Sequence, residues 1–181
     1  MKHNYDQMIK HILHNAQVLT DLYKNIKVTV KKREENKQAW LDACENFHNS
    51  FDAFAFPGGL NHALKLLKKK DPSILPTAIA YLKADPYFHR SGYIKGQIAT
   101  QLKKYSFDEE QRTILQNAIL TTMNKQTACH EFKYYCRLAI KLQNKDFLDR
   151  LQNVINQTDN QIILKRAKYL FNLLQTHQSL N

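Results

Sequence analysis

Glycine and proline are scarce in this 181-residue chain, which contains four of each. Glycine supplies the positive-φ positions that the turns of sheet proteins need, so this scarcity argues against a sheet-rich fold. All of these residues fall between Pro57 and Gly96, and the rest of the chain lacks the two residue types that most often interrupt helices. The chain is therefore predicted to be all-α, with its sharpest bends in one stretch.

Cysteines and long apolar runs are also few. Three cysteines, an odd number without dense spacing, indicate reduced thiols in a reducing compartment. The N-terminal segment lacks the continuous apolar stretch of a signal peptide, and no segment approaches the ~20 apolar residues that span a bilayer. We therefore expect a cytoplasmic protein without membrane contact. The sequence leaves its oligomeric state open.

Acidic residues are the third deficit. The chain has 27 Lys and Arg against 16 Asp and Glu, a formal net charge of +11. Between Asn61 and Tyr105 there are nine cations and two acids, so this stretch alone contributes +7. Such an excess favours acidic partners, either an acidic protein or a nucleic acid.

Apolar residues recur at helical spacing along most of the chain. Trp40, Phe47 and Phe51 belong to the widest apolar stripe, and Pro57-Gly58-Gly59 is expected to end that helix. Asp71-Pro72 and Asp85-Pro86 are similar helix starts. Two further starts are capping boxes at 106–109 and 158–161. The expected helices are 4–24, 34–55, 60–69, 76–84, 90–104, 128–143 and 145–156, together with one that follows each capping box, opened by Ser106 and by Thr158, and reaches about residue 123 and about residue 174.

Eight to nine helices joined by short links predict antiparallel helix pairs. Ala99 and Ala139 lie in similar contexts 40 residues apart, the period of HEAT-type repeats, whereas Ala167 follows after only 28. The expected fold is an irregular HEAT-like stack. The expected organisation is a single domain, 1–181, with an N-terminal helical cap (1–56) and a repeat-like stack (57–181).

Several strings carry a resemblance. Trp40, Phe56-Pro57-Gly58-Gly59, the string 88–95 (FHRSGYIK) and the string 131–137 (EFKYYCR) resemble a small group of uncharacterised helical bacterial proteins. That group implies no activity. Residues 72–174 are similar to HEAT-like repeats, which imply a curved solenoid that binds macromolecules and no catalytic residue.

The predicted helix 128–143 carries a cationic row. Lys133, Arg137 and Lys141 are spaced four apart and lie within about 80° of one another, and His130 and Tyr134 fall on the same side. Such a ridge is suited to a line of phosphates. The alternative is an ordinary solvated helix face.

The predicted helix that starts at Arg90 contains a second group. Lys95 interrupts an apolar stripe, which indicates snorkelling, a structural ion pair or, less commonly, catalysis. Gly92 and Gly96 permit the close approach of another backbone or a ligand.

Residues around the same helix start are candidates for anion or partner binding. His89 and Arg90 lie where free backbone N–H groups attract anions, and Tyr93 is on the far side from the apolar stripe. The alternative is a structural role, in which the Arg90 side chain stabilises the turn at Asp85.

Catalytic and metal motifs are absent from the sequence. Cys44 and His48 are one helical turn apart, but no second pair has zinc-finger spacing, and both lie on or beside the aromatic stripe. We therefore predict no catalytic residue, metal or cofactor.

Three functions fit these patterns. The first is a non-enzymatic helical-repeat module whose basic face binds an acidic protein. The second is a nucleic-acid-binding protein with Arg90, Lys95 and the 133–141 row along a groove. The third is a HEAT-like DNA glycosylase, for which Asp85 beside Tyr87 and Tyr93 is a loose analogue of the catalytic arrangement.

Overall fold

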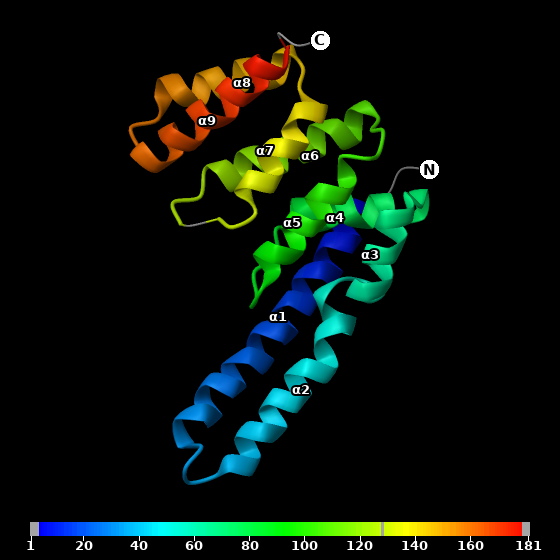
Figure 1. Cartoon of the computed structure of the whole chain (residues 1–181), viewed down its shortest axis with the longest axis vertical. Coiled ribbons are helices and arrows are strands. Elements are labelled where there is room, and N and C mark those ends of the chain that lie inside the picture. The colour runs from blue at the N-terminus through cyan, green and yellow to red at the C-terminus, as the bar shows by residue number, and fades with distance from the viewer. Residues whose placement is uncertain (1–3, 128, 179–181) are drawn as a thin grey trace. The chain divides into compact units, whose positions relative to one another are not determined.

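The computed structural model describes residues 4–127 and 129–178, and within these residues it contains helices and no strand, so the all-α prediction is confirmed. Figure 1 shows the helices joined by short turns. They form two compact units, of which the first ends at Ser91 and the second begins at Gly92. None of the described helices has the length and apolar character that crossing a bilayer requires.

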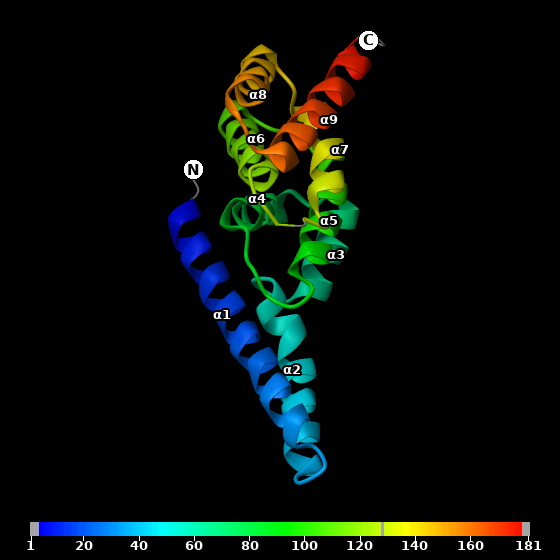
Figure 2. The ribbon, with the colours of Figure 1, turned by 90° about the vertical axis from the view of Figure 1, so that its left-hand side faces the viewer.

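The first unit opens with an antiparallel helical pair. Helix α1 (Tyr5–Thr29) and helix α2 (Lys37–Ala55) lie side by side in Figures 1 and 2 and are joined through a 3₁₀ turn at Val30–Lys32. Helix α1 extends five residues beyond its predicted end at residue 24, through the β-branched residues Ile26, Val28 and Thr29. At the start of α2, the Asn36 side chain accepts a hydrogen bond from a backbone N–H three residues on, which caps the helix.

The aromatic stripe of α2 forms the contact with α1. Phe47 is buried, with its ring centroid 5.7 Å from that of Tyr23 on α1 and 5.5 Å from that of Phe51 one turn along. Aromatic pairs at these distances stabilise packing beyond the area they bury. The periodicity of α2 therefore predicted the side of the helix that packs.

Two shorter helices complete the first unit. Helix α2 ends close to the predicted place, but its C-cap is Phe56 in an extended conformation and not a left-handed glycine. Gly58 and Gly59, with φ angles of 80° and 91°, then turn the chain into helix α3 (Leu60–Lys69). Helix α4 (Leu75–Ala84) packs against α1. The boundary expected after residue 56 therefore lies within the first unit, because α4 shares the core of α1.

The two Asp-Pro sequences behave differently. Asp71 caps the 3₁₀ turn Pro72–Ile74 by accepting a hydrogen bond from the backbone N–H of Ser73, as predicted. The same expectation for Asp85 is wrong, because Asp85 ends α4 with φ 48° and its N–H donates to the carbonyl of Tyr81. Asp tolerates this left-handed conformation better than most residues.

The second unit consists of helices in two layers. Its helices are α5 (Ser91–Leu102), α6 (Glu109–Met123), α7 (Phe132–Leu142), α8 (Lys145–Gln157) and α9 (Gln161–Gln178), with only the first residue of α5 in the first unit. Figure 2 shows α6 and α8 in one layer and α7 and α9 in the other. The pairs α6–α7 and α8–α9 pack together, and α7 also packs against α9. This is a stack of antiparallel helix pairs.

Helix starts in this unit lie slightly later than expected. The capping box of α6 uses Asp108 and Gln111 rather than Ser106, and Asn160 rather than Thr158 caps the first N–H groups of α9. Helix α7 begins at Phe132, and Ala128, where that helix was predicted to start, lies outside the described residues.

A half-buried arginine on α9, Arg166, contacts the loop before α7. The Arg166 guanidinium donates hydrogen bonds to the carbonyl oxygens of Lys125 and Thr127 and lies 5.6 Å from the ring centre of Phe132. Hydrogen bonds from a charged donor are stronger than neutral ones. Arg166 therefore fixes the segment that leads into α7.

Candidate functional site

The two glycines of α5 leave room for side chains at and just before the start of α7. A Cβ atom on Gly96 would lie 2.7 Å from the ring of Tyr134, and one on Gly92 would lie 3.0 Å from the Glu131 carboxylate. Real Cβ atoms do not approach other groups at the shorter distance, so Tyr134 packs where only glycine leaves room. Of the two uses expected for these glycines, a protein group, and in particular the Tyr134 side chain, fills the space at Gly96.

A buried ion pair joins the same two helices. Lys95 Nζ lies 2.7 Å from Glu131 Oε1, and the two side chains are 3% and 6% exposed. Lys125 Nζ is 3.9 Å from the same oxygen and more exposed. The sequence left snorkelling, a structural ion pair or catalysis open for Lys95, and the structure shows the ion pair. Glu131 was missed, although it is the one acid between Glu110 and Asp146 in the sequence.

Three aromatic rings gather above this pair, and we call them the ring cluster. They are Tyr93, His130 and Tyr134, with centroids 4.0 Å apart for Tyr93–His130 and 5.9 Å apart for His130–Tyr134. Tyr93 is 59% exposed and His130 is exposed. Lys133 Nζ lies 5.0 Å from the centre of the Tyr134 ring, which places a cation at the edge of the cluster.

Exposed cations continue from the ring cluster along α7 and also occur on α9. The buried side of α7 includes Leu138 and Ala139, so its cations lie on the opposite, solvent-facing side. Neither α7 nor α9 contains an acidic residue. We call these exposed cations the basic face: Lys133, Arg137, Lys141, Lys165 and Lys168.

The two lysines of α9 were not predicted as site residues. The available signal was the chain after Asp159, which contains cations and no acid. That signal was weak because solvated helix faces often carry such charges.

The remaining predicted residues, His89 and Arg90, belong to the first unit. The His89 ring stacks on Tyr23, with centroids 4.3 Å apart and planes 8° from parallel. Burial, together with the charges of Arg90 and Lys27, lowers the pKa of His89. Arg90 is exposed and adopts a left-handed φ of 71° just before α5. His89 is thus an exposed ring that stacks on Tyr23, and the other six predicted residues lie in the second unit.

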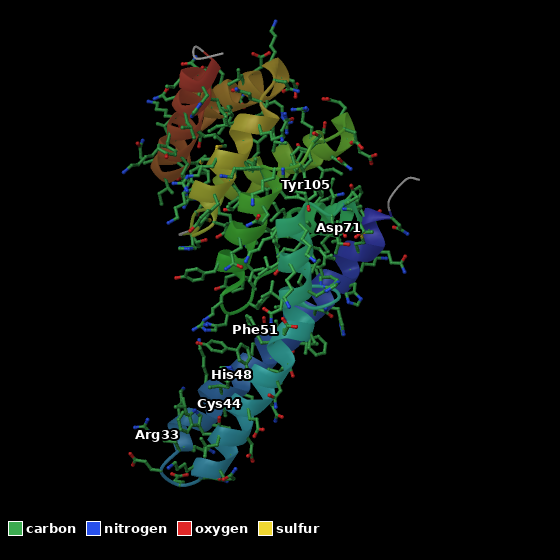
Figure 3. All side chains as sticks on the ribbon, turned by 45° about the vertical axis from the view of Figure 1, so that its right-hand side comes forward. Arg33, Cys44, His48, Phe51, Asp71 and Tyr105 are labelled. Carbon is green, nitrogen blue, oxygen red and sulfur yellow. The ribbon has the colours of Figure 1, made fainter. Side chains whose placement is uncertain are left out.

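The three cysteines are free thiols, and one of them is buried. Cys136 is buried, and burial raises the pKa of its thiol to about 12. Figure 3 shows Cys44 and His48 following one another along α2, with Phe51 one turn further on. Among the described residues, no three His, Cys, Asp or Glu side chains lie together as metal ligands would.

Comparisons with known proteins returned no matching family model, no matching curated protein and no matching solved structure. The all-helical architecture is observed in the chain itself. The resemblances to HEAT-like repeats and to a helical bacterial group remain hypotheses. The basic face, the ring cluster and the buried pair beneath it are therefore interpreted from their own chemistry.

Proposed function

We propose that this protein is a non-enzymatic binding module whose basic face binds an acidic macromolecular partner. The observation that carries this proposal is the segregation of charge between the two layers of the second unit. Helices α7 and α9 contain six cations and no acid, a net charge of +6. Helices α6 and α8 contain three cations and four acids, a net charge of −1.

Segregated charge of this kind creates a field on one side of a rigid unit. Opposite charges on a partner are then attracted and oriented before contact, which raises the association rate. Added salt screens this attraction, so the association rate falls as the salt concentration rises. The acid nearest to α7 in sequence, Glu131, does not weaken this field at the surface, because it is buried and paired with Lys95.

A binding role also fits the environments of Lys95 and Cys136, the two buried side chains that could take part in catalysis. Lys95, the buried cation considered as a catalytic group in the sequence, is paired with the Glu131 carboxylate at 2.7 Å. Cys136, the most buried thiol, keeps its proton at neutral pH because burial raises its pKa to about 12. These groups stabilise the helix packing on which the basic face rests.

The proposal is tested by binding to defined polyanions. The protein is titrated into fluorescein-labelled polyglutamate and into a labelled oligonucleotide at several salt concentrations. We expect binding to at least one of them, with log K falling linearly with log salt concentration. The variant K133Q/R137Q/K141Q should bind at least tenfold more weakly, about 1.4 kcal/mol.

A matched control removes the same charge elsewhere. Lys31, Lys32 and Arg33 are exposed at the tip of the α1–α2 pair, so K31Q/K32Q/R33Q has the same net charge as the test variant. This control should retain wild-type affinity. Equal losses in the two variants would mean that net charge, and not the basic face, determines binding, and would refute the proposal.

A further inference from the structure

The ring cluster narrows the chemistry of the partner. Tyr93, His130 and Tyr134 come from α5 and from the start of α7, and their centroids form a continuous series at 4.0 and 5.9 Å. Tyr93 is 59% exposed, so one side of the series faces solvent. Exposed rings offer flat faces on which planar groups stack.

Packing contacts and an ion pair adjoin the ring cluster. Gly92 and Gly96 bring the backbone of α5 against His130 and Tyr134, with a Cβ on Gly92 falling 3.5 Å from the Cβ of His130. The Lys95–Glu131 ion pair joins the same helices. A platform fixed in this way loses little conformational freedom when a ligand stacks on it, which favours binding.

The ring cluster and the basic face are continuous. Lys133 lies 5.0 Å from the centre of the Tyr134 ring and is also the first cation of the α7 row. Arg137 and Lys141 follow at intervals of about 6 Å along the helix axis. A ligand that stacks on the rings therefore has its next charges beside the cations.

We infer that this surface binds single-stranded nucleic acid, with one or two bases stacked on Tyr93 and His130 and with phosphates along Lys133, Arg137 and Lys141. Stacking platforms beside a cationic track are the means by which proteins bind single strands without reading sequence. An acidic peptide would use the cations and leave the rings without a partner. A duplex keeps its bases stacked inside the helix, so only an unpaired strand presents base faces to the rings.

This inference rests on the proposed function, and the experiment separates the two. Fluorescence anisotropy is measured with a labelled oligothymidylate of about 12 nucleotides, within the site sizes of single-strand binders. Its duplex with oligoadenylate and a polyglutamate of equal charge serve as competitors. We expect the single strand to bind most tightly, with a log–log salt slope of roughly −0.7 for each phosphate contacted.

The decisive variants change the rings and leave the charge intact. Because each stacked base contributes about 1–3 kcal/mol, Tyr93→Leu should weaken oligothymidylate binding at least fivefold and leave polyglutamate binding unchanged. His130→Leu should act in the same direction. Tyr169→Leu is the matched control, since Tyr169 is 56% exposed on α9 and contributes to no ring pair in the cluster.

Each remaining outcome overturns the inference in a recognisable way. If polyglutamate or the duplex binds as tightly as the single strand and Tyr93→Leu changes nothing, the single-strand assignment is wrong while the basic face retains its proposed role. If none of the polyanions binds at low salt, both the inference and the proposed function fail.

Discussion

Replacing one member of the Lys95–Glu131 pair should destabilise the protein far more than replacing both. At 2.7 Å and an effective dielectric constant of about 20, the attraction between the two charges is about 6 kcal/mol. Much of that attraction offsets the cost of removing both charges from water. Glu131→Leu leaves Lys95 charged in an apolar layer, and we expect a loss of about 3–5 kcal/mol of unfolding free energy.

Lys95→Met should lose somewhat less, because Lys125 lies 3.9 Å from Glu131 and remains as a second cation. The double variant Lys95→Met/Glu131→Leu removes both charges and fills the space with apolar atoms. Its stability should lie within about 1 kcal/mol of wild type, as for other buried pairs replaced by apolar residues.

The assay is urea unfolding followed by far-UV circular dichroism, with the four proteins forming a double-mutant cycle. Unchanged m-values would show that the denatured state is the same in each. Single-variant losses below about 1 kcal/mol, or a double variant whose loss equals the sum of the single losses, would refute a buried, coupled pair between α5 and α7.

Three further predictions concern packing and titration. Gly96→Ala should destabilise the protein by about 1–3 kcal/mol in the same urea assay, because the added Cβ meets the Tyr134 ring at 2.7 Å. A gain in stability from the better helix propensity of alanine would contradict this packing. In Ellman titration at neutral pH, Cys136 should react only after denaturation, since its thiol pKa is raised to about 12, and immediate reaction of all three cysteines would disprove its burial. His89 should make the protein less stable as pH falls below its ordinary pKa of 6.5, because its pKa is lowered in the native state and the unfolded chain therefore binds the proton more readily. His89→Phe should remove part of that pH dependence, and an unchanged pH profile would count against the lowered pKa of this stacked ring.

Much of the fold follows from local chemistry that a single sequence contains. The three- and four-residue spacing around Phe47 predicted both α2 and the side on which it packs. The string Pro57-Gly58-Gly59 predicted where that helix ends, although its cap is the extended Phe56, and the positive φ angles of the glycines serve the turn into α3. Helix starts were less certain, since Ser106 and Asp108 are both good caps and only the packed structure selects Asp108.

The candidate site depended on contacts that local patterns do not specify. Lys95 within an apolar stripe predicted that an acid was one of its possible partners, but the choice of Glu131 requires α5 and α7 to be neighbours. The stacking of His89 on Tyr23 likewise joins segments far apart in the chain. Charge segregation between layers became visible only when α7 and α9 were found in one layer.

The most direct test of the proposed function is to map the bound surface by NMR. Amide and side-chain chemical shifts of the isotope-labelled protein are followed while oligothymidylate is added at low salt. The basic face predicts that the largest changes occur at Lys133, Arg137 and Lys141 on α7 and at the lysines of α9, with the Tyr93 ring shifting as well. Changes confined to the first unit, for example at the exposed lysines 68–70 at the C-terminal end of α3, would contradict it.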